Sequence, residues 1–502
     1  MRQPVRRSKI VCTLGPSVAS AEAILKLIEK GMDVARINFS HGTHETHAQV
    51  IGWVREASQK LNIPVAILGD LQGPKIRTGK YLPEVSVMEN GKPVFPIEEG
   101  QKIWFTGVEI GDIRPAKGTE DSPITFSYPR LAQDLRVGDA LLVDDGLIRM
   151  TVLKADPTRN LLQAQVLNGR VLGENKGVNF PGARLSTLGI TEKDWADILF
   201  ALKQDVDFLA LSFVRSAREI RSLRGFLEQK KANVHIIAKI EMSEAIENFD
   251  DILLYVDGIM VARGDLGVEI GNENVPMVQK DLIARCRRAG KPVITATQML
   301  MSMVDNPSPS RAEASDVANA VLDGSDALML SNETASGKYP FEAVETMSVI
   351  IQGAEKFSPN VRTAWSRTGE TEVPGVSEAI EAAATLLATS IRARCLACLT
   401  RSGQAARQLA KYRPRLPIYA FAENPKTRAQ LCLCWGVSVV PWREVNLQDY
   451  TIFDDLLKEL GRMGLVQNDD CAVMTAGIPT TFQVGTTNTV VVKRYPPVPA
   501  AT

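Results

Sequence analysis

The stretch Lys239-Ile240-Glu241 places a lysine and a glutamate two residues apart at the end of an apolar run, HIIAKIE. Alternate residues of a β-strand share one face, so the amine and the carboxylate are predicted to point the same way. Asp265 comes directly after the next apolar run, GIMVARG. Two carboxylates on adjacent strands suit Mg²⁺ or Mn²⁺, because these ions prefer oxygen ligands.

Further polar groups accompany this pair. The stretch VARINFS, residues 34–40, alternates apolar side chains with Arg36, Asn38 and Ser40. Together with Arg77, the arginine and Lys239 would place positive charge around a metal ion. Phosphoryl transfer requires that kind of charge neutralisation and alignment. For residues 34–40 taken alone, a structural network of salt bridges remains the alternative.

Eight short apolar runs separated by helix-like segments carry these residues: 8–15, 34–40, 64–71, 208–214, 235–241, 258–264, 292–299 and 327–333. Near-continuous apolar strands alternating with helices predict an α/β fold, a (β/α)8 TIM barrel. Active sites of such barrels form at the C-terminal ends of the strands. Polar residues follow six of the eight runs, the last of them Glu333, and burying that many charges without a ligand is costly. The strand ends are therefore the predicted site.

Two further domains interrupt or follow the barrel. Residues 75–185 are rich in Gly, Pro and Asp with short alternating runs, which predicts an inserted all-β domain after strand three. A linker-like stretch near 358–377 precedes renewed α/β alternation. We therefore expect barrel segments 1–74 and 186–358, a β-barrel-like lid at 75–185, and a C-terminal α/β regulatory domain at 359–502.

Composition excludes several classes of function. Lys+Arg and Asp+Glu are 58 each, so no basic surplus points to nucleic acid. No apolar run is long enough to span a membrane. Seven scattered cysteines favour a reducing, cytoplasmic setting, and Cys395 and Cys398 are predicted to face opposite sides of one strand. No G-x-x-x-x-G-K-[ST] or strand-linked G-x-G-x-x-G pattern occurs, so any nucleotide must bind by another route.

The chain resembles the pyruvate kinase family over nearly its whole length, in the microbial form without the N-terminal extension of many animal members. The matching motifs, in order, are KIVCTLGPS, ARINFSHG, GDLQGPKIRTG, VDDGLI, NKGVNFPG, DFLALSFVR, AKIE, VARGDLGVEI, TATQML, RAEASDVANAVLDG and LSNETASGKYP. The resemblance implies transfer of phosphate from phosphoenolpyruvate to ADP, giving pyruvate and ATP in glycolysis. It also implies a homotetramer and a lid that closes over the site.

The resemblance assigns roles residue by residue. Lys239 would steady the phosphoryl group, while Glu241 and Asp265 would hold Mg²⁺. Arg36 would contact the phosphate, and the substrate carboxylate would meet Gly264, Asp265 and Thr297. The residues implied for the nucleotide phosphates are Asn38, His41, Arg77 and Lys176. For proton delivery to the enolate, Thr297 and an ordered water both remain candidates.

A phosphorylated effector is expected in the C-terminal domain. The stretch LTRSGQAARQLAKYRP predicts a strand ending at Thr400, a turn, and a helix from about Gly403. Backbone N–H groups at a helix start bind anions, and Thr400, Arg401 and Ser402 add donors. A plain helix cap is the alternative. The resemblance implies a sugar phosphate or a nucleotide monophosphate as activator.

Potassium is the last expectation. In potassium-dependent members, the residues matching Asn38, Ser40, Asp70 and the backbone of Leu71 hold K⁺, and glutamate commonly stands where this chain has Lys75. A lysine there brings its own positive charge, so we expect K⁺ not to be required and the polar face of residues 34–40 to receive the amine. A solvated surface lysine is the alternative.

Two other classes of function remain to be weighed. A Mg²⁺-dependent carbon–carbon lyase on a related barrel would share the carboxylates but would not need the inserted domain or Arg77. A catalytically dead regulator is disfavoured by the intact Lys239, Glu241 and Asp265. Three departures from the family motifs leave these three residues untouched: Met301 for an acid, Asn332 for glycine, and Asp70-Leu71-Gln72-Gly73-Pro74 where many members read D-T-K-G-P.

Overall fold

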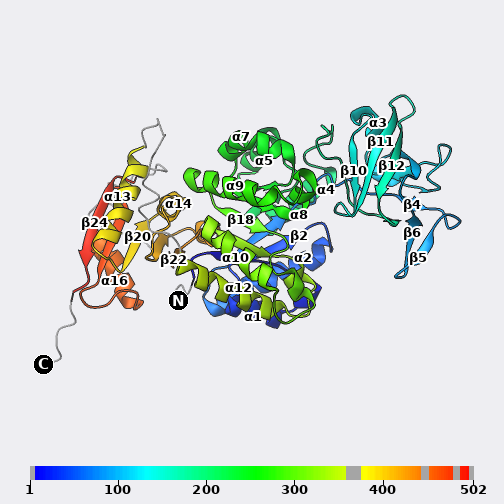
Figure 1. The fold of residues 1–502 in the computed structure, drawn as a ribbon. Helices are drawn as coiled ribbons and strands as arrows, with labels where there is room; N and C mark the ends of the chain where they lie inside the picture. Colours follow the sequence, from blue (N-terminus) through cyan, green and yellow to red (C-terminus); the bar gives the residue numbers. More distant parts are fainter. Residues whose placement is uncertain (1–5, 358–374, 443–450, 479–486, 497–502) are drawn as a thin grey trace.

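The computed structural model describes residues 6–357, 375–442, 451–478 and 487–496. Figure 1 shows a central barrel with a β-rich lid on one side and the C-terminal domain on the other. The predicted boundary near 358 lies outside the described residues.

The eight predicted strands are present and form a closed barrel in the order β1-β19-β18-β17-β16-β15-β3-β2, with parallel pairing throughout. Every residue of β1, β3, β15, β17, β18 and β19 is buried, which explains why their sequences are almost continuously apolar. The strands are β1 (Lys9–Thr13), β2 (Val34–Asn38), β3 (Ala66–Asp70), β15 (Phe208–Leu211), β16 (His235–Ile240), β17 (Gly258–Ala262), β18 (Val293–Ala296) and β19 (Ala327–Leu330).

Helices surround this barrel. Side-chain capping boxes begin four of them, at Thr43, Thr191, Ser216 and Ser310, where each N-cap hydroxyl accepts a backbone N–H that the helix itself leaves unpaired. The helices and 3₁₀ turns of this part are η1 (Pro16–Val18), α1 (Ala21–Lys30), α2 (His44–Leu61), α4 (Glu192–Lys203), α5 (Ala217–Gln229), α6 (Ser243–Glu247), α7 (Phe249–Tyr255), α8 (Arg263–Ile270), α9 (Val275–Ala289), η3 (Met301–Val304), α10 (Arg311–Asp323), α11 (Asn332–Ala335) and α12 (Pro340–Glu355).

The lid is inserted between β3 and α4, as the sequence predicts. It has its own core, in which the rings of Phe105, Phe126 and Phe180 pack together. Its largest sheet has the order β14-β10-β11-β12-β7-β9. Its elements are β4 (Lys80–Tyr81), β5 (Val87–Glu89), β6 (Lys92–Pro96), β7 (Lys102–Gly107), η2 (Ile110–Asp112), β8 (Pro115–Ala116), β9 (Ile124–Phe126), α3 (Leu131–Asp134), β10 (Ala140–Val143), β11 (Ile148–Asp156), β12 (Leu161–Asn168), β13 (Val171–Gly173) and β14 (Val178–Asn179).

The C-terminal domain is a five-stranded sheet in the order β22-β21-β20-β23-β24, of which only β24 is antiparallel to its neighbour. Cys395 and Cys398 are both buried and belong to the hydrophobic cores on opposite faces of β20, which confirms the alternation read from the sequence. The elements are α13 (Val376–Ser390), β20 (Cys395–Leu399), α14 (Gln404–Lys411), β21 (Ile418–Ala422), α15 (Pro425–Leu431), β22 (Val437–Pro441), α16 (Ile452–Arg462), β23 (Cys471–Ala476) and β24 (Thr489–Arg494).

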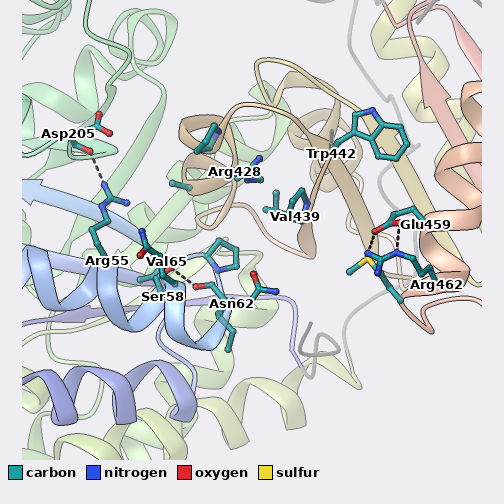
Figure 2. Close-up of a pocket in the computed structure, with 17 residues that line it drawn as sticks. Arg55, Ser58, Asn62, Val65, Asp205, Arg428, Val439, Trp442, Glu459 and Arg462 are labelled. Atoms are coloured by element: carbon teal, nitrogen blue, oxygen red, sulfur yellow. Dashed lines mark hydrogen bonds and ion pairs between the residues drawn. The ribbon is translucent and has the colours of Figure 1, made fainter. Parts of the chain in front are cut away.

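A cavity of about 830 Å³ lies between the barrel and the C-terminal domain, lined from α2 on one side and from α15, β22 and α16 on the other (Figure 2). Its charged side chains are engaged within the chain: Arg462 pairs with Glu459, and Arg55 donates to the carbonyl of Asp205. None of the residues that the sequence singled out for chemistry or for an effector lines this cavity.

Within the described residues, none of the helices combines the length and apolar character needed to cross a membrane.

Candidate active site

Lys239 lies at the centre of the polar groups in the barrel mouth. Its Nζ is 2.9 Å from Glu241 Oε1 and 3.4 Å from Asp70 Oδ1, and it donates a 2.7 Å hydrogen bond to Ser212 Oγ. Both carboxylate side chains are only 1% exposed, and that of the lysine is 12% exposed. The structure therefore brings Lys239 and Glu241 onto one face, as their two-residue spacing predicts.

Electrostatics keeps this lysine charged. Burial alone would lower the pKa of Lys239, but Asp70 and Glu241 outweigh burial and raise it above its ordinary value. Burial likewise opposes ionisation of Asp70, yet Lys239 and Arg36 lower its pKa overall. Burial raises the pKa of Glu241, and Lys239 opposes that rise. Lys239 is thus a fixed positive charge around neutral pH and not a proton carrier.

Arg36 reaches the same centre from β2. Its Nε lies 2.6 Å from Asp70 Oδ2, and its Nη1 donates to Thr13 Oγ1 at 2.9 Å. The alternation predicted for β2 is observed, because Ala35 and Ile37 are buried while Arg36 and Asn38 are partly exposed. The polar face of this strand thus meets the end of β3.

Gly264, Asp265 and Thr297 meet where α8 begins. The Gly264 N–H donates to Thr297 Oγ1 at 2.9 Å, and that hydroxyl donates to the Ala296 carbonyl at 2.6 Å. Thr297 has a φ of +70°, a strained conformation for a β-branched residue. Backbone strain of this kind concentrates at functional sites.

Lys75 departs from expectation. Its Nζ pairs with Asp265 Oδ1 at 3.2 Å, and both side chains are about one-quarter exposed. The expectation that the polar face of residues 34–40 receives this amine is therefore wrong in this structure. The turn at Gly73 and Pro74 instead directs the Lys75 side chain towards Asp265, one of the two candidate metal ligands.

The carboxylates fit a hard divalent cation. Glu241 directly follows β16, Asp265 lies in the first turn of α8 after the neighbouring strand β17, and Asp265 lies close enough to oppose ionisation of Glu241. No group of three or more His, Cys, Asp or Glu side chains that could hold a metal occurs among the described residues. Mg²⁺ is commonly bound by one or two carboxylates together with waters and substrate oxygens, which this donor set matches.

The residues expected at the nucleotide lie on two domains. Arg77 donates to the Asn175 carbonyl at 3.1 Å, and the lid places Lys176 one residue further along. Lys176 Nζ pairs with Asp144 at 2.8 Å. Asn38 and His41 lie on the barrel instead, at and just beyond the end of β2. Only a substrate bound between the lid and the barrel would contact both the lid residues, Arg77 and Lys176, and the barrel residues.

The oxygen donors expected for potassium mostly have partners within the chain. Asn38 Oδ1 accepts the Ser40 N–H at 3.1 Å, the Leu71 carbonyl accepts Ser212 Oγ at 2.7 Å, and Arg36 binds Asp70 Oδ2. Asp70 Oδ1 is buried and receives no hydrogen bond from the described residues.

At the ends of β1 and β15 no site residue was predicted from the sequence, and Glu333, after β19, was wrongly predicted to lie in the site. Thr13 ends β1 and Ser212 follows β15, so polar groups of the site come from these strands also. A hydroxyl directly after a run of apolar residues was the available signal. Glu333, in contrast, is fully buried and accepts the N–H groups of Leu300 and Ser331, so it braces the backbone.

A cavity of about 870 Å³ opens between this site and the lid. Its walls include Lys75, Asp265 and Thr297 from the barrel side. Met301 and Asn332, two of the departures from the family motifs, line the same cavity. They therefore lie beside the site and not among its charged groups.

The candidate effector segment has the predicted local form. β20 ends at Leu399, Gly403 is the N-cap of α14 with a φ of +80°, and its N–H donates to Thr400 Oγ1 at 3.0 Å. Ser402 Oγ accepts the Gln404 N–H at 3.4 Å. These bonds are those of a helix cap and are equally compatible with an anion site.

Comparison with known proteins agrees with this geometry. The family described as "Pyruvate kinase, barrel domain" matches residues 5–344, and "Pyruvate kinase, alpha/beta domain" matches residues 378–493. A pyruvate kinase of Geobacillus stearothermophilus is 45% identical over 484 residues, covering 96% of this chain and 79% of that protein. One of Staphylococcus aureus (strain MRSA252) is 43% identical over 484 residues, covering 96% and 80%.

A solved structure adds agreement in three dimensions. The crystal structure of a pyruvate kinase from Cryptosporidium parvum superimposes with a TM-score of 0.88 at 35% identity, covering 98% of this chain and 97% of that one. The order of the domains and the barrel-mouth constellation are thus accompanied by similarity along almost the whole chain. The chain belongs to the pyruvate kinase family of phosphotransferases.

Proposed function

We propose that the protein transfers the phosphoryl group of phosphoenolpyruvate to ADP, with Lys239, Arg36 and Thr297 as catalytic residues and Glu241 and Asp265 as ligands of Mg²⁺ or Mn²⁺. The observation that carries these roles is the position of the Lys239 amine at the mouth of the barrel, 2.9 Å from Glu241 Oε1 and 3.4 Å from Asp70 Oδ1, where both carboxylates raise its pKa above the ordinary value. A coupled assay tests the function: pyruvate formation must require both phosphoenolpyruvate and ADP. Pyruvate formed without ADP would instead support the lyase alternative, and no pyruvate at all a regulator.

The charged groups suggest how the transfer proceeds. Arg36 and Lys239 contact different oxygens of Asp70, so two cations lie together at the barrel mouth, and a phosphoryl group in transfer requires such positive charge around it. The divalent metal, when bound, neutralises charge on substrate oxygens. The Gly264 N–H and Thr297 Oγ1 are already joined, so they would orient the substrate carboxylate as a unit.

The lid would complete the site. Arg77 and Lys176 provide the lid's positive charges for nucleotide phosphates, and closure would keep water from a transferable phosphoryl group. Proton delivery to the enolate remains assigned either to Thr297 or to an ordered water. We further propose cytoplasmic glycolysis as the setting and a homotetramer as the assembly, on the strength of family membership.

Potassium independence is proposed on the charge of Lys75. Its amine lies 3.2 Å from Asp265, at the edge of the site. Two unit positive charges 4 Å apart repel by roughly 4 kcal/mol at an effective dielectric of 20, and the repulsion falls with distance, so Lys75 would weaken K⁺ binding from its place beside Asp265 and not from within the donor set of Asn38, Ser40 and Asp70. We expect substantial activity in K⁺-free buffer with tetramethylammonium as counter-ion, and we expect Lys75→Glu to make activity depend on K⁺.

The matched control for this experiment is Lys80→Glu, which makes the same charge change at an exposed lid position. It should leave the response to K⁺ unchanged. A wild-type enzyme that is almost inactive until K⁺ is added would refute the proposal. The cation would then be assigned to Asn38, Ser40, Asp70 and the Leu71 carbonyl, where Asp70 Oδ1 faces Lys239 Nζ at 3.4 Å without a hydrogen bond.

An activator carrying a phosphate is proposed for Thr400, Arg401, Ser402 and Gly403. The N-terminal N–H groups of α14 and the neighbouring hydroxyls form the supporting feature. A panel of sugar phosphates and nucleotide monophosphates is expected to contain a compound that raises both the melting temperature and the activity. Ser402→Glu should abolish that response, because its carboxylate repels the phosphate. Stabilisation that survives this substitution unchanged would place the site elsewhere.

A further inference from the structure

The loop after β15 contacts Lys239 and Glu241, which we call the catalytic pair. It also contacts both chain segments that connect the lid to the barrel. We propose that Ser212–Arg215, which we name the coupling segment, transmits the position of the lid to Lys239 and Glu241, with Arg215 as its positioning residue. The connections of the lid are named the outgoing arm, residues 71–75, and the return arm, residues 181–189. The inference rests on the roles proposed above for Lys239 and Glu241.

One end of the coupling segment holds the catalytic pair. Ser212 Oγ accepts the hydrogen bond from Lys239 Nζ at 2.7 Å, and the Phe213 N–H donates to Glu241 Oε2 at 2.8 Å. Phe213 has a φ of +54°, which is strained for a bulky residue and persists only where the surroundings enforce it. The backbone is thus held in an unfavourable conformation that directs an N–H at the metal-ligand candidate.

The same two residues also hold the outgoing arm. Ser212 Oγ donates to the Leu71 carbonyl at 2.7 Å. A Cβ atom at Gly73 would lie 2.9 Å from Phe213 Cδ2 and 3.0 Å from Ser212 Cβ, so only glycine allows this approach. The φ of Gly73 is +68°, a second reason for glycine at this position. The outgoing arm therefore packs directly on the coupling segment.

Arg215 holds the return arm. Its Nη1 donates to the Leu185 carbonyl at 2.6 Å and its Nη2 to the Thr187 carbonyl at 2.8 Å. The nearest atoms of Glu219 and Glu244 are farther from its Nε, at 3.8 and 4.0 Å. A planar guanidinium that makes two hydrogen bonds to one chain segment fixes both distance and orientation, which a lysine cannot do.

These contacts give a short mechanical connection. When the lid rotates, its return arm moves the carbonyls that Arg215 binds, and only Val214 separates Arg215 from the strained Phe213. A shift of Phe213 changes the hydrogen bond to Glu241, while a shift of Ser212 changes the one to Lys239. Lid closure and alignment of the catalytic pair would then be a single event, in keeping with the need to react only when water is excluded.

The decisive variant is Arg215→Lys, which retains the charge but loses the paired hydrogen bonds. Losing about one hydrogen bond's net contribution corresponds to roughly a 5–10-fold effect. We expect the dissociation constant of Mn²⁺, measured by electron paramagnetic resonance with phosphoenolpyruvate present, to rise by that factor. Trypsin should also cleave the return arm after the exposed Arg184 faster, and substrate should no longer protect it.

Arg218→Lys is the matched control, because Arg218 is an exposed arginine one turn further on in α5. It should behave as wild type in both measurements. A second variant, Phe213→Gly, adopts a positive φ without strain and keeps the backbone N–H that binds Glu241. It removes the aromatic ring that packs against Gly73. It should abolish substrate protection of Arg184 while leaving Mn²⁺ binding without substrate unchanged.

Faster cleavage in Arg215→Lys with Mn²⁺ affinity and kinetic constants within twofold of the Arg218→Lys control would overturn the proposal, since Arg215 would then be a hinge brace only. If Arg215→Lys does not fold, Phe213→Gly decides, and retained substrate protection in it would overturn the proposal equally. Errors in the roles of Lys239 and Glu241 show separately, as retained turnover in variants of those residues, while the cleavage results stand.

Discussion

Replacing Lys239 by methionine is expected to lower turnover by about 10²–10³ while phosphoenolpyruvate still binds, because one preorganised electrostatic stabiliser of the transition state is lost. The amine lies within 3.4 Å of two buried carboxylates, which raise its pKa above the ordinary value, and the nearby Arg36 is already paired with Asp70 Oδ2. Steady-state kinetics gives the turnover, and titration calorimetry with phosphoenolpyruvate and Mg²⁺ gives the binding. The pH dependence of turnover in the wild type should show no lysine ionisation around neutrality.

Controls must separate chemistry from folding in this experiment. Methionine leaves Asp70 and Glu241 without their amine, and breaking a buried pair typically destabilises by about 3–5 kcal/mol. Lys239→Arg retains the charge, so we expect a melting temperature near that of wild type but a turnover still well below it. Lys203→Met, at an exposed position at the end of α4, should change neither quantity. Near-normal turnover of Lys239→Met at saturating Mg²⁺ would show that the assigned role is wrong.

Replacing Glu241 by glutamine is expected to raise the Mg²⁺ concentration for half-maximal activity by about 10–100-fold, a range that applies even to groups that only orient metal ligands. Glutamine keeps the shape and one acceptor oxygen but removes the charge that a divalent cation requires. The same substitution leaves Lys239 with Asp70 as its remaining carboxylate partner. Activity measured as a function of Mg²⁺ and, separately, of Mn²⁺ provides the test.

The comparison variant for this second experiment is Glu247→Gln, which removes an exposed carboxylate from α6 close by in sequence. Its Mg²⁺ dependence should equal that of wild type. Unchanged metal dependence in Glu241→Gln would remove Glu241 from the metal site and leave it as the counter-ion of Lys239 alone.

Several features were predictable because they depend on residues close in sequence. The alternation of Arg36 and Asn38 with Ala35 and Ile37 follows from the two-residue period of a strand, and the structure confirms it. The shared face of Lys239 and Glu241 has the same origin. The eight strands were recognisable because six of them are buried along their whole length and all eight are largely apolar.

Other features depend on how the loops bring distant segments together. Glu333 follows a barrel strand, as Glu241 ends one, yet it turns to two backbone N–H groups and leaves the site. Ser212 carried no charge that would have marked it, although it bonds to Lys239 and to Leu71. Periodicity places a side chain on a face but does not say which partner meets it.

The sequence by itself determined the barrel, the inserted lid, the third domain and the charged strand ends, since periodicity and turn residues act over a few positions. Only the tertiary structure decided where Lys75 lies, because its partner Asp265 is 190 residues away and belongs to another strand end. It likewise decided that one four-residue loop joins both lid arms to the catalytic pair. Such contacts follow from closure of the barrel, which brings strand ends from the whole chain to one rim, and no local pattern encodes the side-chain positions within it.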